Sequence, residues 1–457
     1  MTTPDATTTP QDKSAARASW RETMAVYLQP RVLIVMFLGF SSGLPLALSG
    51  STLRFWMRES GVDLETIGLF ALVGTPYTLK FLWAPLVDAL DIPLLSKWLG
   101  RRRGWLMLSQ ILLIVAIAIL GFCNPAFLPW YIVFGAAVLV ATASATQDIV
   151  VDAFRIESLQ ESEQAAGMAS YVAAYRISNL VSTAGALYIV SGFEGLGFAR
   201  SAAWTSGYIV MAAMILIGMV AVAVALEPEK SAAAITSRKQ GSSFNRVIET
   251  STSAFTDFLT RDMALVVLAF IILFKFTDAF AGIMTEAFVL DLGFQRTDYA
   301  NIVKGVGLIA TLLGGFAGGF VARAYALPTA LWIGGILQAV ANLSFSWLAL
   351  VGNSQWALAL AITAENFTSA IGTVIFVAYL SSLCTNPLHT ATQYALLSAF
   401  SAFGRTYLSS GAGYVAKATG WPIFFVICML VAIPSLLLLA WLQNRGHFAE
   451  LGKAQNR

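Results

Sequence analysis

The chain has 457 residues, of which 57% are hydrophobic and only 12% are charged, and its formal net charge is +3. This charged fraction is about half that of an ordinary soluble domain, so the composition excludes a soluble globular protein. The three cysteines are too few and too scattered for a disulfide framework or a metal site, and neither histidine has a nearby acid of the kind hydrolases use. We therefore expect no enzymatic activity, no cofactor, no metal and no nucleic-acid partner.

Apolar segments follow one another along almost the whole chain. Each is roughly 20 residues long, enough for a helix to cross about 30 Å of hydrocarbon, and the alternating pattern of a membrane β-barrel is absent. The sequence predicts an all-α integral membrane protein with twelve spans, at 32–53, 66–87, 105–122, 128–149, 165–190, 204–226, 263–288, 299–322, 329–350, 355–383, 391–416 and 421–442. An even number of spans places both termini on one side.

The basic residues predict which side that is. Of the 28 Lys and Arg residues, eighteen fall on the face shared with the termini, five on the opposite face and five inside spans. The positive-inside rule therefore predicts cytoplasmic termini.

The longest polar stretch, 227–262, divides the spans into six plus six. We expect a tail at 1–31 whose end has the spacing of an interfacial helix, a six-helix bundle at 32–226, a cytoplasmic linker at 227–262, a second bundle at 263–442 and a tail at 443–457. Within the linker, "FNRVIETSTSAFTDFLTRD" is amphipathic, which fits either an interfacial helix or a helix packed on the bundle.

The two halves also repeat one another. Trp56, Glu59 and Gly61 recur as Phe288, Asp291 and Gly293 at a constant spacing of 232 residues, and Arg176 recurs as Arg405 after 229. Parallel six-helix repeats with a substrate site between them are typical of transporters of the major facilitator type.

Charges inside spans are costly and mark functional sites by default. Spans 3, 6, 9 and 12 contain none, which fits peripheral helices around a charged central cavity. The nine charged residues are Lys80, Asp148, Arg176, Lys275, Asp278, Glu286, Lys304, Glu365 and Arg405. Lys275 and Asp278 are three residues apart, so mutual neutralisation is an equal alternative to a functional role.

An anionic substrate needs fixed cations, and arginine offers a planar fork for carboxylates. We expect Lys80, Arg176, Lys275, Lys304 and Arg405 to bind it, with Tyr77, Trp83 and Gln147 as further contacts. Purely structural roles for Arg176 and Arg405 are the alternative. Proton coupling is assigned to Asp148, Asp152, Asp278 and Glu365, with Asp148 as the carrier and Asp152 paired to Arg155 in a cytoplasmic gate. Asp88, Arg101, Arg102 and Arg103 are further gating candidates.

Several of these stretches resemble a known family. "GFSSGLPLALSGSTLRFW", "TIGLFALVGTPYTLKFLWAPLVD", "GRRRGWLMLSQ", "ATQDIVVDAFRIESL", "KFTDAFAG", "VKGVGLIATLLGG" and "HTATQYALLSAFSAFGR" are similar to the AmpG-type muropeptide permeases of Gram-negative inner membranes, over residues 28–445. The resemblance implies proton-driven import of anhydromuropeptides, peptidoglycan recycling and a part in β-lactamase induction, by a protein we expect to be a monomer. A major facilitator transporter of another anionic metabolite or of a drug is the alternative.

Overall fold

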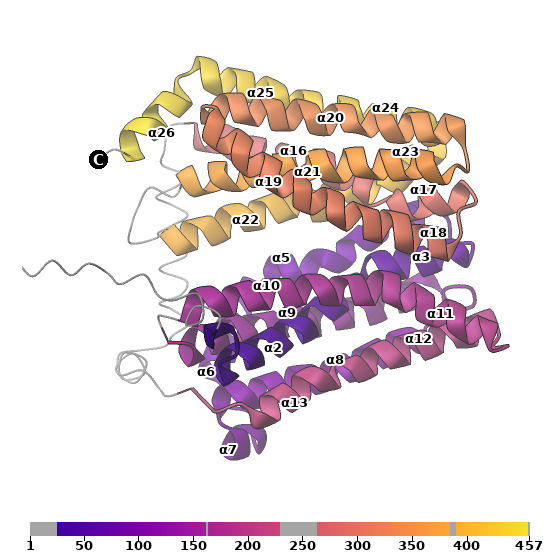
Figure 1. Ribbon diagram of the computed structural model, residues 1–457, viewed down its shortest axis with the longest axis vertical. Helices are drawn as coiled ribbons and strands as arrows, with labels where there is room; N and C mark the ends of the chain where they lie inside the picture. Colours follow the sequence, from indigo (N-terminus) through magenta and orange to yellow (C-terminus); the bar gives the residue numbers. More distant parts are fainter. Residues whose placement is uncertain (1–24, 161–162, 229–262, 384–389, 456–457) are drawn as a thin grey trace, which may run out of the picture.

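The computed structural model describes residues 25–160, 163–228, 263–383 and 390–455. Within these ranges the regular structure is entirely helical and forms twelve passes in two bundles of six, as the hydropathy pattern predicts (Figure 1). The passes begin and end at the same end of the molecule, which we call the terminal side; the opposite end is the far side (Figure 1). Most of the predicted linker and N-terminal tail lies outside the described residues.

The first bundle contains passes 1 to 6. Its helices are α2 (Pro30–Ser49) and α3 (Ser51–Glu59) in pass 1; α4 (Leu64–Leu69), η1 (Phe70–Gly74), α5 (Thr75–Leu79), η2 (Lys80–Leu82) and α6 (Ala84–Ala89) in pass 2; α7 (Leu95–Leu99) in the following loop; α8 (Arg101–Phe122) in pass 3; α9 (Trp130–Ser158) in pass 4; α10 (Gln164–Leu180), η4 (Val181–Gly185) and α11 (Ala186–Gly195) in pass 5; and α12 (Arg200–Met214) and α13 (Leu216–Val224) in pass 6.

The second bundle contains passes 7 to 12. Its helices are α16 (Ala264–Gly282) and α17 (Thr285–Asp291) in pass 7; α18 (Arg296–Asp298), η5 (Tyr299–Val306) and α19 (Gly307–Ala324) in pass 8; α20 (Leu327–Val351) in pass 9; α21 (Gln355–Leu383) in pass 10; α22 (Thr390–Tyr407), η6 (Leu408–Gly411) and α23 (Ala412–Thr419) in pass 11; and α24 (Trp421–Leu430) and α25 (Ala432–Asn444) in pass 12, followed by α26 (His447–Gln455).

Passes 1 and 2 are interrupted near the centre of the molecule. The α2 helix continues through Pro45, and the break falls at Gly50, whose φ of −110° and ψ of −106° are not helical. In pass 2, Pro76 has no N–H to donate to the carbonyl of Leu72. The Thr75 hydroxyl donates to that carbonyl instead, at 2.6 Å. The polar backbone at this break is therefore satisfied, as a buried membrane segment requires.

Small residues bring helices within each bundle into close contact. A Cβ on Gly39 or Gly43 of α2 would lie 2.6 or 2.5 Å from a carbonyl oxygen of α10, and one on Gly314 of α19 would lie 2.2 Å from the Phe367 carbonyl of α21. Gly39 and Gly43 are four residues apart, as are Gly314 and Gly318, which is the small-xxx-small spacing of tightly packed membrane helices. These contacts make each bundle a compact unit.

The two bundles meet mainly through three pairs of passes: 1 with 7, 2 with 11 and 5 with 8. The closest approach joins passes 2 and 11, where a Cβ on Gly413 would lie 1.8 Å from the Leu64 carbonyl oxygen. Figure 1 shows the bundles converging at the far side, where α3, α17 and α18 lie, and separating toward the terminal side. The molecule is therefore closed at the far side.

Candidate functional site

A polar cavity lies between the bundles and consists of two adjoining pockets. The Glu286 pocket, of about 230 Å³, is lined by residues of passes 5, 7, 8 and 10. The Arg405 pocket, of about 420 Å³, is lined by residues of passes 1, 2, 5, 7, 10 and 11. Asn179, Gly282 and Glu365 line both pockets. Passes 3, 6, 9 and 12 contribute no lining residue to either pocket.

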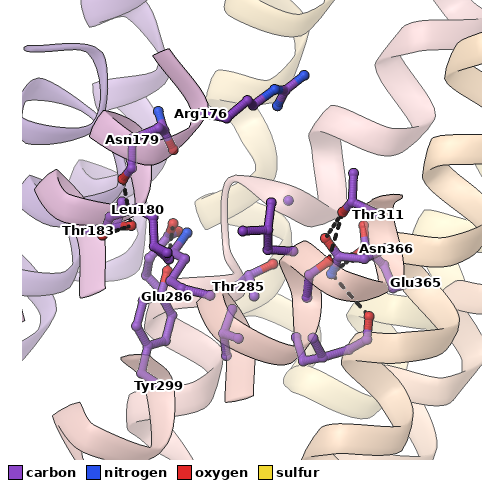
Figure 2. Close-up of a pocket in the computed structure, with 16 residues that line it drawn as sticks. Arg176, Asn179, Leu180, Thr183, Thr285, Glu286, Tyr299, Thr311, Glu365 and Asn366 are labelled. Atoms are coloured by element: carbon purple, nitrogen blue, oxygen red, sulfur yellow. Dashed lines mark hydrogen bonds between the residues drawn. The ribbon is translucent and has the colours of Figure 1, made fainter. Parts of the chain in front are cut away.

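Two arginines line this cavity from opposite bundles. Arg176 of α10 lines the Glu286 pocket, and Arg405 of α22 lines the Arg405 pocket. Both side chains are exposed to the cavity, and neither has a hydrogen bond or ion pair with any residue that the structure describes. The two pockets share Asn179, Gly282 and Glu365, so the two guanidinium groups face adjoining parts of one cavity. Figure 2 shows Arg176 extending from its helix into the space between the bundles.

Glu365 of α21 stands where the two pockets join. Its carboxylate accepts a hydrogen bond from the Asn366 side chain at 2.8 Å, and no ion pair holds it in the described chain. Asn366 also lies within hydrogen-bonding distance of the Thr311 hydroxyl, at 3.2 Å (Figure 2). Glu365 is therefore a carboxylate with free acceptor capacity, in contact with both parts of the cavity.

A second carboxylate closes the Glu286 pocket toward the far side. Glu286 of α17 is only 3% exposed and accepts bonds from Arg54 at 3.3 and 3.4 Å. The Tyr299 hydroxyl donates to the same carboxylate at 3.2 Å, and the Lys304 ammonium lies 5.2 Å from the centre of the Tyr299 ring. Glu286 of pass 7 is thus held by residues of passes 1 and 8, whereas Arg176 and Arg405 have no such partner among the described residues.

Lys275 and Asp278 form an ion pair in α16, with 3.2 Å between Nζ and Oδ2. Lys275 also donates to the Thr373 hydroxyl at 2.8 Å, and Asp278 accepts from Ser369 at 2.6 Å. Asp278 lines the Arg405 pocket. The geometry matches the alternative in which the two charges neutralise each other, and it leaves Lys275 less free than the arginines to bind a substrate.

Asp148 of α9 belongs to a hydrogen-bonded group inside the first bundle. It accepts from the Ser42 hydroxyl, which in turn accepts from Tyr171 at 3.2 Å. Lys80 acts on Asp148 electrostatically and has no hydrogen bond or ion pair among the described residues. Neither Asp148 nor Lys80 lines the two pockets.

The three polar and aromatic residues predicted to contact the substrate do not all line the cavity. Tyr77 lines the Arg405 pocket. Trp83 donates to the Thr146 hydroxyl at 3.1 Å, and Gln147 is fully buried and donates to Ser41 at 3.2 Å. Trp83 and Gln147 therefore pack inside the first bundle in this conformation.

The family model "Major Facilitator Superfamily" matches residues 32–406. The anhydromuropeptide permease of Escherichia coli (strain K12) is 38% identical over 418 residues, which cover 91% of this chain and 80% of that protein. A protein described as putative transporter AmpG 4, from Rickettsia felis, is 34% identical over 422 residues, covering 92% of this chain and 98% of its own. The chain belongs to the AmpG family of the major facilitator superfamily.

Solved structures at lower identity show the same fold. The nucleoside transporter NupG aligns with this AmpG-family chain at a TM-score of 0.64 and 14% identity, covering 93% of this chain and 99% of that one. A D-xylose–proton symporter aligns at 0.64 and 11% identity, covering 90% and 97%. The chain is thus a multi-pass membrane transporter rather than an enzyme.

The predicted gating residues of this AmpG-family chain lie at the terminal side within the first bundle. Arg155 and Asp152 form the expected pair along α9, with 3.7 Å between Nη2 and Oδ1. Arg102 is buried and pairs with Glu157 at 2.6 Å, and Arg103 donates to the carbonyl oxygens of Val222 and Ala223. Arg101 begins α8, and the side chain of Asp88 lies outside the described residues.

The ion pairs that do join the bundles lie at the far side and were not predicted from the sequence. Arg58 pairs with Asp291 at 2.5 Å, and Arg296 pairs with both Glu59 and Glu194 at 2.6 Å. Hydrogen bonds from Arg296 outweigh the effect of burial and lower the pKa of Glu194. The only sequence signal for this gate is the recurrence of Glu59 as Asp291. Their basic partners follow no repeat visible in the sequence.

Proposed function

We propose that this chain imports anhydromuropeptides from the periplasm to the cytoplasm in symport with protons, by alternating access. An anhydromuropeptide is a disaccharide that bears a short peptide with several carboxylates. The observation that supports this proposal is a pair of arginines, Arg176 and Arg405, that face one cavity from opposite bundles and have no partner among the described residues. An arginine left unpaired in a membrane protein is costly, so a ligand that supplies carboxylates stabilises it. The 38% identity to a permease of that name supports the same substrate.

The orientation follows from the charges. The terminal side is proposed to face the cytoplasm, because the basic loops lie there. In that orientation the described conformation is closed toward the periplasm by the far-side ion pairs and faces inward. Each chain contains a complete cavity between its own bundles, which supports a monomer in the inner membrane of a Gram-negative bacterium.

Proton coupling requires a carboxylate that takes up a proton on one side and releases it on the other. Glu365 and Asp278 both line the cavity, and Asp148 lies in the first bundle beside Ser42. We propose that these three acids carry the coupling proton, with Asp148 exchanging it toward the terminal side. Asp152, already paired with Arg155, belongs to the terminal-side gate.

The test is uptake of a labelled anhydromuropeptide into proteoliposomes, with and without an inward pH gradient. We expect accumulation above equilibrium only with the gradient, and its collapse when a protonophore is added. Uptake that is indifferent to the gradient would reject coupling. If the protein transports another anionic metabolite but not this substrate, the proposed substrate is rejected and proton-coupled alternating access is retained.

A further inference from the structure

A third, much smaller pocket lies inside the second bundle, behind the wall of the central cavity. Its volume is about 10 Å³, and every residue that lines it is polar: Asp278 of α16, Gln338 and Asn342 of α20, and Glu365, Thr368 and Ser369 of α21. We call it the Gln338 pocket. It brings together the two cavity acids of this bundle with two amides from pass 9, a helix that contributes nothing to the central cavity.

Gln338 is the unusual member of this group. It is only 6% exposed, and its Nε2 donor has no hydrogen-bond partner in the described part of the chain. A buried donor without a partner is costly, so this position favours an acceptor inside the pocket. Asn342 is 4% exposed and uses its own Nδ2 on the Gln338 backbone carbonyl, at 3.1 Å. It therefore does not satisfy Gln338.

The hydroxyl groups that line the pocket already donate hydrogen bonds to other protein atoms, so the pocket has room for one small hydrogen-bond acceptor. The Thr368 hydroxyl donates along its own helix, at 2.9 Å to the Ala364 carbonyl, and Ser369 donates to Asp278. The pocket volume is close to that of a single water molecule, which typically makes two to four hydrogen bonds in such sites. A water oxygen can accept from Gln338, and its two protons can be donated to Asp278 and Glu365.

A sodium ion fits the pocket less well. The Lys275 ammonium lies 3.2 Å from Asp278 and already supplies that carboxylate with a positive charge. Two further cations act on these acids from neighbouring passes: Arg405 of α22 on Asp278, and Lys304 of η5 on Glu365. A fourth cation beside these three fixed ones is electrostatically disfavoured, whereas a neutral water is not.

We propose that one water molecule occupies the Gln338 pocket and relays the coupling proton between Asp278 and Glu365, with Gln338 and Asn342 as positioning residues. This inference rests on the proposed proton coupling. One carboxyl group gives its proton to the water oxygen while the water passes a different proton to the other carboxylate. The water is regenerated and one proton has moved. Because this route runs behind the cavity wall, it stays open while substrate fills the central cavity.

The test uses the full-length protein in proteoliposomes and the variant Gln338→Leu, which keeps the size of the side chain and removes its amide. We expect accumulation driven by a pH gradient to fall about tenfold or more, since positioned proton transfer typically contributes at least this factor. Exchange of labelled for unlabelled anhydromuropeptide at equal pH should change less than about twofold, because substrate contacts are intact. Asn342→Leu should act in the same direction.

Gln110→Leu is the matched control. Gln110 is fully buried in α8, has no hydrogen-bond partner on either side-chain atom and precedes Gln338 by 228 residues, in the corresponding pass of the other bundle. It contributes to none of the three pockets. Both transport modes should therefore survive this replacement.

The outcomes separate this inference from the proposed function. If wild-type uptake ignores the pH gradient, proton coupling itself fails, and the relay fails with it. If wild-type uptake follows the gradient and Gln338→Leu accumulates substrate normally, the relay alone is overturned. Equal loss of accumulation and exchange in both Gln338→Leu and Asn342→Leu would make them structural residues. If accumulation requires sodium and potassium cannot replace it, the pocket is a cation site and the proposed water relay is rejected.

Discussion

We propose that substrate selection depends most directly on Arg176 and Arg405. Both face the cavity without a partner, so a ligand carboxylate gains a charge-assisted hydrogen bond that no protein group has to give up. We expect Arg176→Ala and Arg405→Ala each to weaken binding of a peptide-bearing muropeptide about tenfold or more, and binding of the bare disaccharide much less. Isothermal titration with both ligands makes the comparison. Equal losses would indicate that the arginines support the fold.

Asp148 and Asp152 lie one turn apart on α9, and their replacement by Asn should produce different transport defects. Asp148→Asn mimics the protonated acid, so uptake driven by a pH gradient should collapse while substrate exchange at equal pH is largely kept. Asp152→Asn removes the partner of Arg155 and should slow uptake and exchange together, several-fold. Transport assays in both modes decide between them. Gradient-driven accumulation by Asp148→Asn would leave the carrier role to Glu365 or Asp278.

Lys275 and Asp278 should behave as a coupled pair in stability measurements. Lys275→Met or Asp278→Asn alone leaves one uncompensated charge inside the membrane, which costs about 2 kcal/mol. The double variant leaves none, so its melting temperature in detergent should lie closer to wild type than that of either single variant. Additive losses in the double variant would show that the 3.2 Å contact carries no coupling energy.

At the residue scale, charged residues inside the predicted spans indicate which side chains line the cavity, but they do not indicate which residues form ion pairs. Arg176, Glu365 and Arg405 line the central cavity, and each was predicted from its place inside a span. Arg54 was missed as the partner of Glu286 because it follows the last apolar residue of the predicted first span. The structure continues that helix to Glu59, and its partner comes from 232 residues further on. No local pattern reports such a distant contact.

The elements that break regular helical geometry gather where the bundles meet. Passes 2 and 11 contain 3₁₀ turns (η1 and η6), and passes 5 and 8 contain π-helical turns (η4 and η5). The η4 and η5 segments contact each other, as do η1 and η6. Irregular turns are tolerated at membrane depth only when they face protein or a cavity. Pro76 lies at the break in pass 2, whereas α2 continues through Pro45, so the positions of the breaks depend on packing between the bundles as well as on proline.

Replacing Gly413 by alanine tests the closest contact between passes 2 and 11. A methyl group there would lie 1.8 Å from the Leu64 carbonyl, so Gly413→Ala should force passes 2 and 11 apart and favour opening of the far side. We expect several-fold faster labelling of a cysteine at Thr285, in a cysteine-free background, by an impermeant maleimide added from the far side. Gly411→Ala is the control, since a methyl group there meets nothing within 4 Å. Equal labelling of the two variants would contradict this account.

For the whole molecule, the repeat extends further than the sequence comparison suggested. Gly61 and Gly293 both have positive φ, 82° and 84°, and each follows the last helix of pass 1 or pass 7. The next helices begin at Leu64 and Arg296, again 232 residues apart. The bundle and repeat architecture was therefore predictable from periodicity. The conformation was not, because closing one side or the other uses the same twelve helices.

Acidification at the far side should weaken closure through Glu194. Arg296 lowers the pKa of this carboxyl group in the closed state. The ion pair therefore stabilises the closed state fully at pH values above the ordinary pKa of a glutamate. It is lost as the pH falls through the lowered pKa. Spin labels at Ala126 and Ser354, in far-side loops of the two bundles, should show a growing open population over that interval.

Glu194→Gln is the control for this pH effect. The variant keeps the shape of the side chain and removes its titration, so the spin-label distances should depend less on pH over the same interval. A pH response equal to that of wild type would assign the effect to other far-side carboxylates.

The far-side ion pairs also make the transporter responsive to electrolytes. Arg58 and Asp291 are each about a quarter exposed or less, at 25% and 20%, and the carboxylate of Glu194 is 29% exposed, so solvent reaches all three. Dissolved ions screen such charges over a Debye length of about 8 Å at physiological ionic strength. With the far side facing the periplasm, as proposed above, a saltier periplasm would loosen the closed gate and raise the outward-facing population. Turnover would follow the osmotic environment of the cell without any change in substrate concentration.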